Sequence, residues 1–304
     1  MLNALDFLLL SLTLPIVLMA SVIGNYERHV PVWLIKLYRY GSFGYKGPGG
    51  RFMQSIELPK SYYRHYYVFS SVLSGLALVY MSLVYFVGVE VNLQFKAALQ
   101  TLLDQRQPAV TVTSALVGMG LIHLHCVRRC YESHLLQVFS SSGRINLCHH
   151  GVAFIHYATL VLAAIGETPL FCGDQSRGEI QWWGGHTKAV LPCVVLFLLA
   201  SYEQYASNVI LANLRKDKKS GAVFTEEHKI PHGRMFEMVS SPHRLCEIIL
   251  YAAFAALIPT RTMFIMWVWV FSNQIQSALH AHEWYKKTFD NYPQNRMAII
   301  PYLL

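Results

Sequence analysis

A basic loop reads Asn213-Leu-Arg-Lys-Asp-Lys-Lys219 and continues through Lys229-Ile-Pro-His-Gly233 to Phe236-Glu-Met-Val-Ser-Ser-Pro242. Two apolar segments flank it, Val190–Leu211 before and Leu245–Ile258 after. A helix needs about 20 apolar residues to cross the hydrocarbon core of a bilayer. Lys and Arg collect in the loops on the cytosolic side of a membrane. This part of the sequence therefore predicts membrane-spanning helices joined by a cytosolic loop.

The same alternation of apolar segments and polar loops extends over the whole chain. Of its 304 residues, 54% are hydrophobic and only 14% are charged, whereas soluble domains carry about 25% charged residues. We predict an all-α, polytopic membrane protein with about seven transmembrane helices in a single domain, residues 1–304. The predicted spans are Leu5–Ile23, Val68–Val89, Val110–Cys126, Leu147–Ile165, Val190–Leu211, Leu245–Ile258 and Met263–Leu279. The last two flank Pro259 and can also be read as one re-entrant hairpin, so the predicted count is six to seven.

The basic residues predict how these spans are oriented. With a lumenal N-terminus, the lumenal loops hold Lys96, Arg106, Arg177, Lys188 and Arg261. The other 20 of the 25 Lys and Arg residues then lie on the cytosolic side, together with the C-terminus. This is the positive-inside pattern, and attraction to anionic lipid accounts for the formal net charge of +8. We therefore expect membrane lipid, and no nucleic acid, as a partner.

The cysteines and the glycine-rich segment carry no recognisable site. Of the six cysteines, only Cys172 falls in a predicted lumenal loop, so we expect no disulfide framework. Cys126 and Cys130 lack a second pair of ligands, so we expect no metal site. The segment Gly41–Gly50 lacks the spacings of phosphate-binding loops. It is either a connector between the first two spans or a lid over a cytosol-facing site.

Glu57 and the tyrosines that follow it are the first candidates for chemistry, because polar groups at a membrane span are costly unless they are used or paired. Desolvation beside an apolar span would favour the protonated form of Glu57 and make it a proton donor. The alternative is a charge that caps the helix or pairs with Lys60 or Arg64. Tyr66 belongs to the run of tyrosines behind it, which offers further hydroxyl donors.

A second group contains two arginines. His125, Arg128, Arg129 and Glu132 can share the cytosolic end of one helix. The planar guanidinium suits phosphate. The alternative for the arginines is the positive charge that ends a span on the cytosolic side.

A third group forms a polar stripe on the predicted helix over residues 190–211. Gln204, Asn208 and Arg215 are spaced at i, i+4 and i+11, which places them on one face. Such a stripe needs either a ligand or hydrogen-bond partners on neighbouring helices.

A fourth group lies in the last hundred residues. Glu247 follows His243 by one helical turn, and Tyr285 follows His282 by three residues. They are candidates for ligand contact. The alternative for His282 and Tyr285 is a belt of polar aromatic side chains at the membrane surface.

Taken in order, these motifs resemble the steroid 5-alpha-reductase family, and within it the polyprenol (polyprenal) reductase branch. The resemblance extends from about Tyr40 and is specific from Gln204 to Leu304, the half (about residues 200–304) that binds the cofactor in such enzymes. It includes His282-Glu-Trp-Tyr-Lys286. It implies NADPH-dependent reduction of the α-isoprene double bond of polyprenal or polyprenol. That reaction belongs to dolichol synthesis for protein N-glycosylation, in the endoplasmic reticulum membrane.

The resemblance also implies roles for individual residues. It places Glu57, with Tyr66, at the catalytic end of a long-chain isoprenoid substrate. The residues implied for NADPH are Arg129, Gln204, Asn208, Arg215, Lys229, His243, Glu247, His282 and Tyr285, of which Arg129, Arg215 and Lys229 would hold the phosphates. Ile56 stands where the steroid enzymes have Gln, and Cys126 where they have a catalytic Tyr. These two departures argue against a steroid substrate.

Other functions remain open from the sequence alone. One is reduction of a 3-oxo steroid or a long-chain enoyl thioester, because size and apolarity do not separate these lipids. Another is a membrane methyltransferase of the isoprenylcysteine type, which would bind S-adenosylmethionine and need fewer cations. A third is a receptor or transporter without enzymatic activity. Protection from unfolding by NADPH or by S-adenosylmethionine discriminates between the two enzyme classes.

Overall fold

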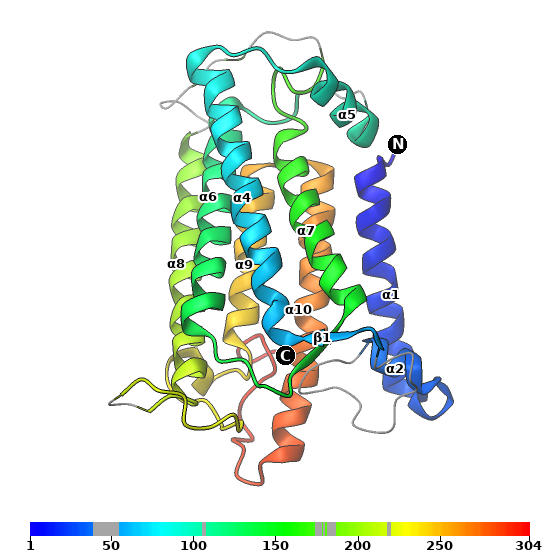
Figure 1. Cartoon of the computed structure of the whole chain (residues 1–304), viewed down its shortest axis with the longest axis vertical. Helices are drawn as coiled ribbons and strands as arrows, with labels where there is room; N and C mark the ends of the chain where they lie inside the picture. Colours follow the sequence, from blue (N-terminus) through cyan, green and yellow to red (C-terminus); the bar gives the residue numbers. More distant parts are fainter. Residues whose placement is uncertain (39–54, 105–107, 174–177, 179, 181–186, 218–219) are drawn as a thin grey trace.

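The computed structural model describes residues 1–38, 55–104, 108–173, 178, 180, 187–217 and 220–304. The segment Gly41–Gly50 lies outside the described residues. Long helices running side by side dominate the molecule, and the chain reverses direction after each of them (Figure 1).

Seven long helices lie where the sequence predicts apolar spans. They are α1 (Ala4–Tyr26), α4 (Tyr63–Ser82), α6 (Val112–Tyr131), α7 (Leu147–Ile165), α8 (Thr187–Asn213), α9 (Pro242–Leu257) and α10 (Arg261–Thr288). The shorter elements are η1 (Glu27–His29), α2 (Val32–Tyr38), η3 (Lys60–Tyr62), η4 (Leu83–Val87), α5 (Leu93–Leu103), η5 (Glu132–Leu136) and η6 (Arg234–Glu237). The predicted pair at the C-terminal end is thus two helices, with Pro259 in the turn between them.

Four of the described helical segments are long and apolar enough to cross a membrane. They are Ala4–His29, Lys60–Val87, Leu147–Ile165 and Val190–Asn213. Of the remaining three helices, α9 has only 16 residues. The other two, α6 and α10, carry polar side chains such as Arg128 and Gln274. The membrane character is therefore confirmed, and the count of about seven crossings stays a prediction.

Side-chain caps fix where several helices begin. At the start of α1, the Asn3 side chain accepts from Asp6 N, and the Asp6 carboxylate accepts from Asn3 N. The side chains of Asn146 and Thr260 cap α7 and α10 by accepting from the backbone N–H of His149 and of Met263. Each cap satisfies a backbone N–H that has no partner inside the helix. The polar residues that precede the apolar segments therefore set the boundaries of the bundle.

A small sheet corrects the prediction of an exclusively helical chain. Strand β1 (Glu57–Pro59) pairs antiparallel with β2 (Arg144–Asn146), with Leu58 opposite Ile145. The backbone N–H of Lys60 extends the pairing by donating to Gly143 O at 2.9 Å. Both strands lead directly into helices, so the sheet ties the entry of α4 to that of α7. The prediction missed it because three residues carry no usable alternation pattern.

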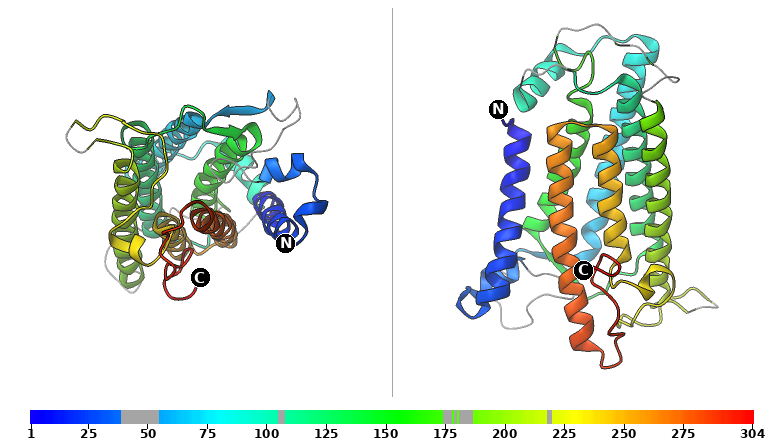
Figure 2. Two further views of the ribbon diagram at one scale, coloured as in Figure 1. Left: turned by 90° about the horizontal axis from the view of Figure 1, so that it is seen from below. Right: turned by 180° about the vertical axis from the view of Figure 1, so that it is seen from behind.

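The two ends of the bundle differ in what they carry. The N-terminus, α5 and the turn between α9 and α10 lie at one end (Figures 1 and 2). The other end holds α2, the small sheet, residues 214–217 and 220–241, and the C-terminus. Helix α8 packs on α9, α4 on α6 and α7, and α1 on α10. Asp6 of α1 also accepts from Arg261 Nε at 2.9 Å and from Thr262 Oγ1 at 2.7 Å. The end with the C-terminus is called the basic end below, because it holds the loop rich in Lys and Arg.

Candidate functional site

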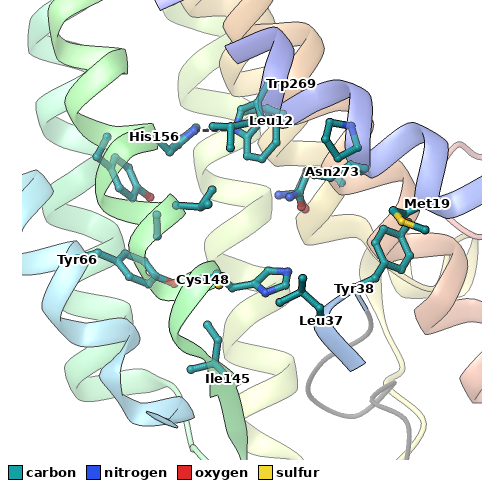
Figure 3. A pocket seen from close by; sticks show the side chains of 18 of the residues that line it. Leu12, Met19, Leu37, Tyr38, Tyr66, Ile145, Cys148, His156, Trp269 and Asn273 are labelled. Atoms are coloured by element: carbon teal, nitrogen blue, oxygen red, sulfur yellow. Dashed lines mark hydrogen bonds between the residues drawn. The ribbon is translucent and has the colours of Figure 1, made fainter. Parts of the chain in front are cut away.

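A cavity of about 470 Å³ opens among α1, α4, α7 and α10, with α2 on its side toward the basic end. Its wall is largely aliphatic and aromatic, and side chains such as Leu12, Met19 and Leu37 face it (Figure 3). Its polar lining includes Ser11, Tyr38, Tyr63 and His149 and two further sets. Asn273 and Gln274 lie on α10, and the other set comprises Tyr66, Tyr67, Tyr157, His156 and Glu247. The cavity therefore combines an apolar wall with a few hydroxyl and carboxylate groups, as lipid-binding sites do.

His156 is held rigidly at the wall of this cavity. Trp269 Nε1 donates to His156 Nδ1 at 3.0 Å (Figure 3). On its other side, His156 Nε2 lies 2.6 Å from the Tyr251 hydroxyl. Indole N–H groups only donate, so Nδ1 is the acceptor and Nε2 carries the hydrogen. His156 therefore donates to Tyr251 and joins α7, α9 and α10 through one neutral imidazole.

A network of charged side chains lies next to the cavity, where α6 continues into η5. Arg128 Nη1 donates to Glu132 Oε1 at 2.5 Å, and Arg129 donates to the other carboxylate oxygen. Asn208 Nδ2 of α8 adds a third bond to Glu132, at 2.8 Å. The Glu132 side chain is fully buried, and each arginine side chain is 14% exposed. One buried carboxylate thus partners two guanidinium groups and the amide of a neighbouring helix.

Gln204 extends this network to α9. Its Oε1 accepts from Arg128, and its Nε2 donates to His243 O at 2.9 Å and to Glu247 Oε2 at 2.5 Å. These three partners fix the orientation of the Gln204 amide, with its oxygen toward Arg128 and its nitrogen toward Glu247 and the His243 carbonyl. Glu247 connects the charged network to the cavity, because its side chain also lines the cavity.

His125 lies between the arginines and Glu247. Its Nδ1 is 3.2 Å from Arg128 Nη2, and its Nε2 is 3.5 Å from Glu247 Oε1. A guanidinium only donates, so Nδ1 accepts and the hydrogen sits on Nε2, facing the carboxylate. The predicted residues Arg129, Gln204, Asn208, His243 and Glu247 are therefore brought together, and Glu132 and Tyr67 join them.

His282 and Tyr285 form a separate cluster on α10, toward the basic end. Ser240 Oγ lies 2.6 Å from His282 Nδ1 and 2.5 Å from the Tyr292 hydroxyl. The rings of Tyr285 and Tyr292 stack with centroids 5.3 Å apart and 12° between their planes. The predicted pair is thus packed against the C-terminal segment, where it offers aromatic faces and ring nitrogens.

Arg215 and Lys229 lie in the loop region at the basic end. Arg215 Nη1 donates to Val138 O at 2.9 Å, and Lys229 Nζ lies 4.7 Å from the centre of the Phe224 ring. Arg215 is also close enough to interact electrostatically with Lys60 and with Tyr285. Arg215 therefore lies between the strand β1 region and the aromatic cluster of α10.

A buried arginine outside the predicted site residues holds the C-terminal segment in place. Arg296 is 2% exposed, and its Nη1 donates to Pro231 O at 2.8 Å. Its Nη2 lies 3.2 Å from His232 Nδ1 and 3.4 Å from Glu237 Oε2. The backbone N–H of Gly233, and then Arg296, lower the pKa of the Glu237 carboxyl. These contacts of Arg296 link the loop that precedes α9 to the C-terminal segment.

The two predicted catalytic residues end up in different places. Tyr66 is buried at the cavity wall, and its side chain points into the cavity (Figure 3). Glu57 lies on the exposed strand β1, opposite Asn146, and does not line the cavity. The sequence signal for a second residue of this kind is the run of tyrosines that contains Tyr66, because Tyr67 of the same run also lines the cavity.

Several buried polar atoms at the site have no partner among the described residues. They include Nδ1 of His243, Nε of Arg128 and Nε of Arg296. Such atoms are costly to leave unsatisfied. The Nε atoms of the two arginines are donors, and Nδ1 of His243 can donate or accept, so each of these atoms can bind a polar ligand.

Comparisons with known proteins identify the relatives of this chain. The sequence profile of a family described as 3-oxo-5-alpha-steroid 4-dehydrogenase matches residues 175–304. A polyprenal reductase of Drosophila melanogaster is 37% identical over 295 residues, covering 95% of this chain and 90% of the relative. The polyprenal reductase of Mus musculus is 30% identical, with coverage of 88% and 85%. That of Homo sapiens is 29% identical, with coverage of 82% and 79%.

Proposed function

Because this chain belongs to the steroid 5-alpha-reductase family, in its group of polyprenal reductases, we propose that it reduces the α-isoprene double bond of polyprenal with NADPH. The observation that carries the proposal is the cavity, in which an apolar wall meets tyrosine hydroxyls and a carboxylate that belongs to the arginine network. A prenyl aldehyde needs the same combination, because its chain is apolar and its reacting end is polar.

The reaction sets three requirements for the protein. Hydride must reach the β-carbon of the conjugated aldehyde, a donor must stabilise the charge that grows on the carbonyl oxygen, and a proton must reach the α-carbon. The cofactor supplies the hydride when bound, and the chain supplies orientation and electrostatics. Glu57 lies outside the cavity, so we assign the donor side to Tyr66 and Tyr67, two of the three tyrosines of α4 that line it.

We assign the cofactor to the donors between the cavity and the basic end. The part of the cofactor nearest the cavity would contact Arg129, Gln204, Asn208, His243 and Glu247. His282 and Tyr285 would contact it toward the basic end, where Arg215 and Lys229 would hold phosphate. The unsatisfied Nδ1 of His243 and the cations of the loop support this assignment. Two or more Lys and Arg groups with few carboxylates suit a cofactor with a 2′-phosphate.

The membrane setting follows from the same proposal. With the basic end toward the cytosol, the C-terminus is cytosolic and the N-terminus lumenal, and NADPH reaches its site from the cytosol. We place the protein in the endoplasmic reticulum membrane, where the reduction would serve dolichol synthesis for protein N-glycosylation. The substrate is a long-chain isoprenoid lipid that enters from the bilayer.

The test uses microsomes from cells that lack endogenous polyprenal reductase activity, with and without this chain expressed. They receive NADPH with polyprenal, with polyprenol or with a Δ4-3-oxo steroid, and products are identified by mass. A gain of two hydrogens on polyprenal alone is the expected result. Conversion of the steroid alone would move the function to steroid reduction. No product from any substrate, with no protection from unfolding by NADPH, would remove the reductase proposal.

Replacing Arg215 tests the phosphate assignment. We expect Arg215→Ala to raise the KM for NADPH by about 10- to 150-fold, since charge-assisted bonds contribute roughly 1.5–3 kcal/mol, and to leave the KM for polyprenal unchanged. Steady-state kinetics on purified protein measure both. Arg144→Ala is the matched control, because Arg144 at the same end also donates to backbone carbonyls, at Ser141 and Gly143. An unchanged KM for NADPH in Arg215→Ala would contradict the assignment.

A further inference from the structure

Tyr67 of α4 connects the cavity to the arginine network. Its side chain lines the cavity, is 7% exposed, and carries a hydroxyl that lies 2.9 Å from Arg129 Nη2. The guanidinium carbon of Arg129 also lies 5.1 Å from the centre of the Tyr67 ring. Because a guanidinium only donates, the Tyr67 oxygen accepts this bond, and its own hydrogen remains to be donated elsewhere.

The surroundings hold this hydroxyl in one place. The Tyr67 ring packs between Tyr66, with centroids 4.6 Å apart, and Tyr157, with centroids 6.0 Å apart. Arg129 is itself fixed by its ion pair with the buried carboxylate of Glu132. A donor that is fixed before the reaction needs no reorganisation as charge develops, which is the condition for strong electrostatic stabilisation.

Arg129 also makes Tyr67 a better donor. A cation that donates to the oxygen of a hydroxyl draws electron density from it and strengthens the bond that the hydroxyl's hydrogen can form. The described contacts thus place a guanidinium directly on the hydroxyl of Tyr67, which lines the cavity. The thiol of Cys126, in contrast, is fully buried and within hydrogen-bonding reach of Ser70 and Ser74, away from the cavity lining.

We propose that Tyr67 is the catalytic hydrogen-bond donor to the carbonyl oxygen of the substrate, and that Arg129 is the positioning residue that orients and polarises its hydroxyl. The proposal rests on the proposed function and adds to it the identity of the donor. Tyr66, at the neighbouring position of α4, is the rival candidate.

In this step, electrons shift from the incoming hydride through the conjugated system to the carbonyl oxygen. The β-carbon C3 accepts a hydride from NADPH, the electrons of the C2=C3 bond form a C1=C2 bond, and the carbonyl π electrons move to the oxygen. Tyr67 donates a hydrogen bond to that oxygen and keeps its proton. A proton from water then adds to C2 and the carbonyl re-forms. The sum is one hydride and one proton added across C2=C3, with NADP⁺ as the oxidised product.

The first experiment compares three tyrosine-to-phenylalanine variants of the full chain in the polyprenal assay. Tyr67→Phe keeps the ring stack and the cation–π contact, and we expect it to lower kcat by about 100- to 1,000-fold, the effect of removing one oxyanion donor. The KM for NADPH should change by less than about threefold, because the hydroxyl is not among the groups assigned to the phosphates. Tyr80→Phe, on the same helix but outside the cavity lining, is the matched control and should stay within about threefold of wild type.

The outcomes separate this proposal from the proposed function. A wild-type chain that does not reduce polyprenal would remove the function itself, before any variant is compared. An active wild type with a kcat for Tyr67→Phe within threefold of it would overturn the role of Tyr67. A larger loss in Tyr66→Phe than in Tyr67→Phe would give the role to the rival residue.

A double-mutant cycle tests the contribution of Arg129 separately. Arg129→Lys keeps the positive charge beside Glu132 and withdraws the guanidinium fork from Tyr67. We expect it to lower kcat by about tenfold or more alone and by less than about threefold in the Tyr67→Phe background. A merely structural role would give the same loss in both backgrounds and would overturn the pairing. If Tyr67→Phe fails to accumulate as folded protein, Arg129→Lys alone decides, because an unchanged kcat there excludes polarisation by Arg129.

Discussion

Glu132→Ala should cost this protein about 3–5 kcal/mol of stability, the effect of removing one partner from a buried ion pair. Glu132 is fully buried and accepts from Arg128, Arg129 and Asn208. Without its carboxylate, two guanidinium groups that are each 14% exposed face one another with no opposite charge between them. The cost therefore comes from leaving cations uncompensated in an apolar region rather than from losing one bond.

The measurement is the unfolding of purified protein in detergent, followed by denaturant or heat. Glu203→Ala is the matched control, since Glu203 is also a glutamate of the same bundle and pairs with Arg234, whose side chain is 42% exposed. We expect that substitution to cost no more than about 1 kcal/mol, as surface ion pairs do. Equal losses of stability in the two variants would show that the burial of Glu132 does not determine how much its ion pairs contribute to stability.

The long helices were predictable because apolar segments of about 20 residues leave few alternatives in a membrane. All seven predicted segments are helices in the structure. The pairing of β1 with β2 was not predictable, since it joins residues 57–59 to residues 144–146 through three-residue strands. Contacts at that separation depend on how α4 and α7 pack, and the local sequence does not carry that information.

The candidate site shows the same division between local pattern and packing. Helical spacing correctly grouped Arg129 with Glu132, and Gln204 with Asn208, because residues three or four apart share a face. It did not show which residue of a tyrosine run reaches the arginines. Tyr66 and Tyr67 differ by about 100° around the helix axis, and only the packing of α4 against α6 decides that Tyr67 meets Arg129. Helical spacing also did not show that the pairing of β1 with β2 places Glu57 at the surface.

Glu247→Gln should reduce kcat/KM for polyprenal reduction by about 100-fold. Glu247 is the carboxylate of the network that also lines the cavity, accepting from Gln204 Nε2 at 2.5 Å and facing His125 Nε2 at 3.5 Å. The substitution keeps the shape of the side chain and removes its charge. Small displacements of groups beside a reacting centre are enough for losses of this size.

A second substitution separates the effect of Glu247→Gln on stability from its effect on turnover. Arg128, Arg129, Glu132 and Glu247 sum to a formal charge of zero, and Glu247→Gln alone leaves +1 in the network. Adding Arg128→Gln restores neutrality, so we expect the double variant to regain at least half of the stability that Glu247→Gln loses. Activity should stay low, because Gln204 Oε1 then lacks the guanidinium that orients its amide. Unfolding and turnover measured on the same four proteins check both statements. Stability losses that simply add would mean that the two charges are not coupled.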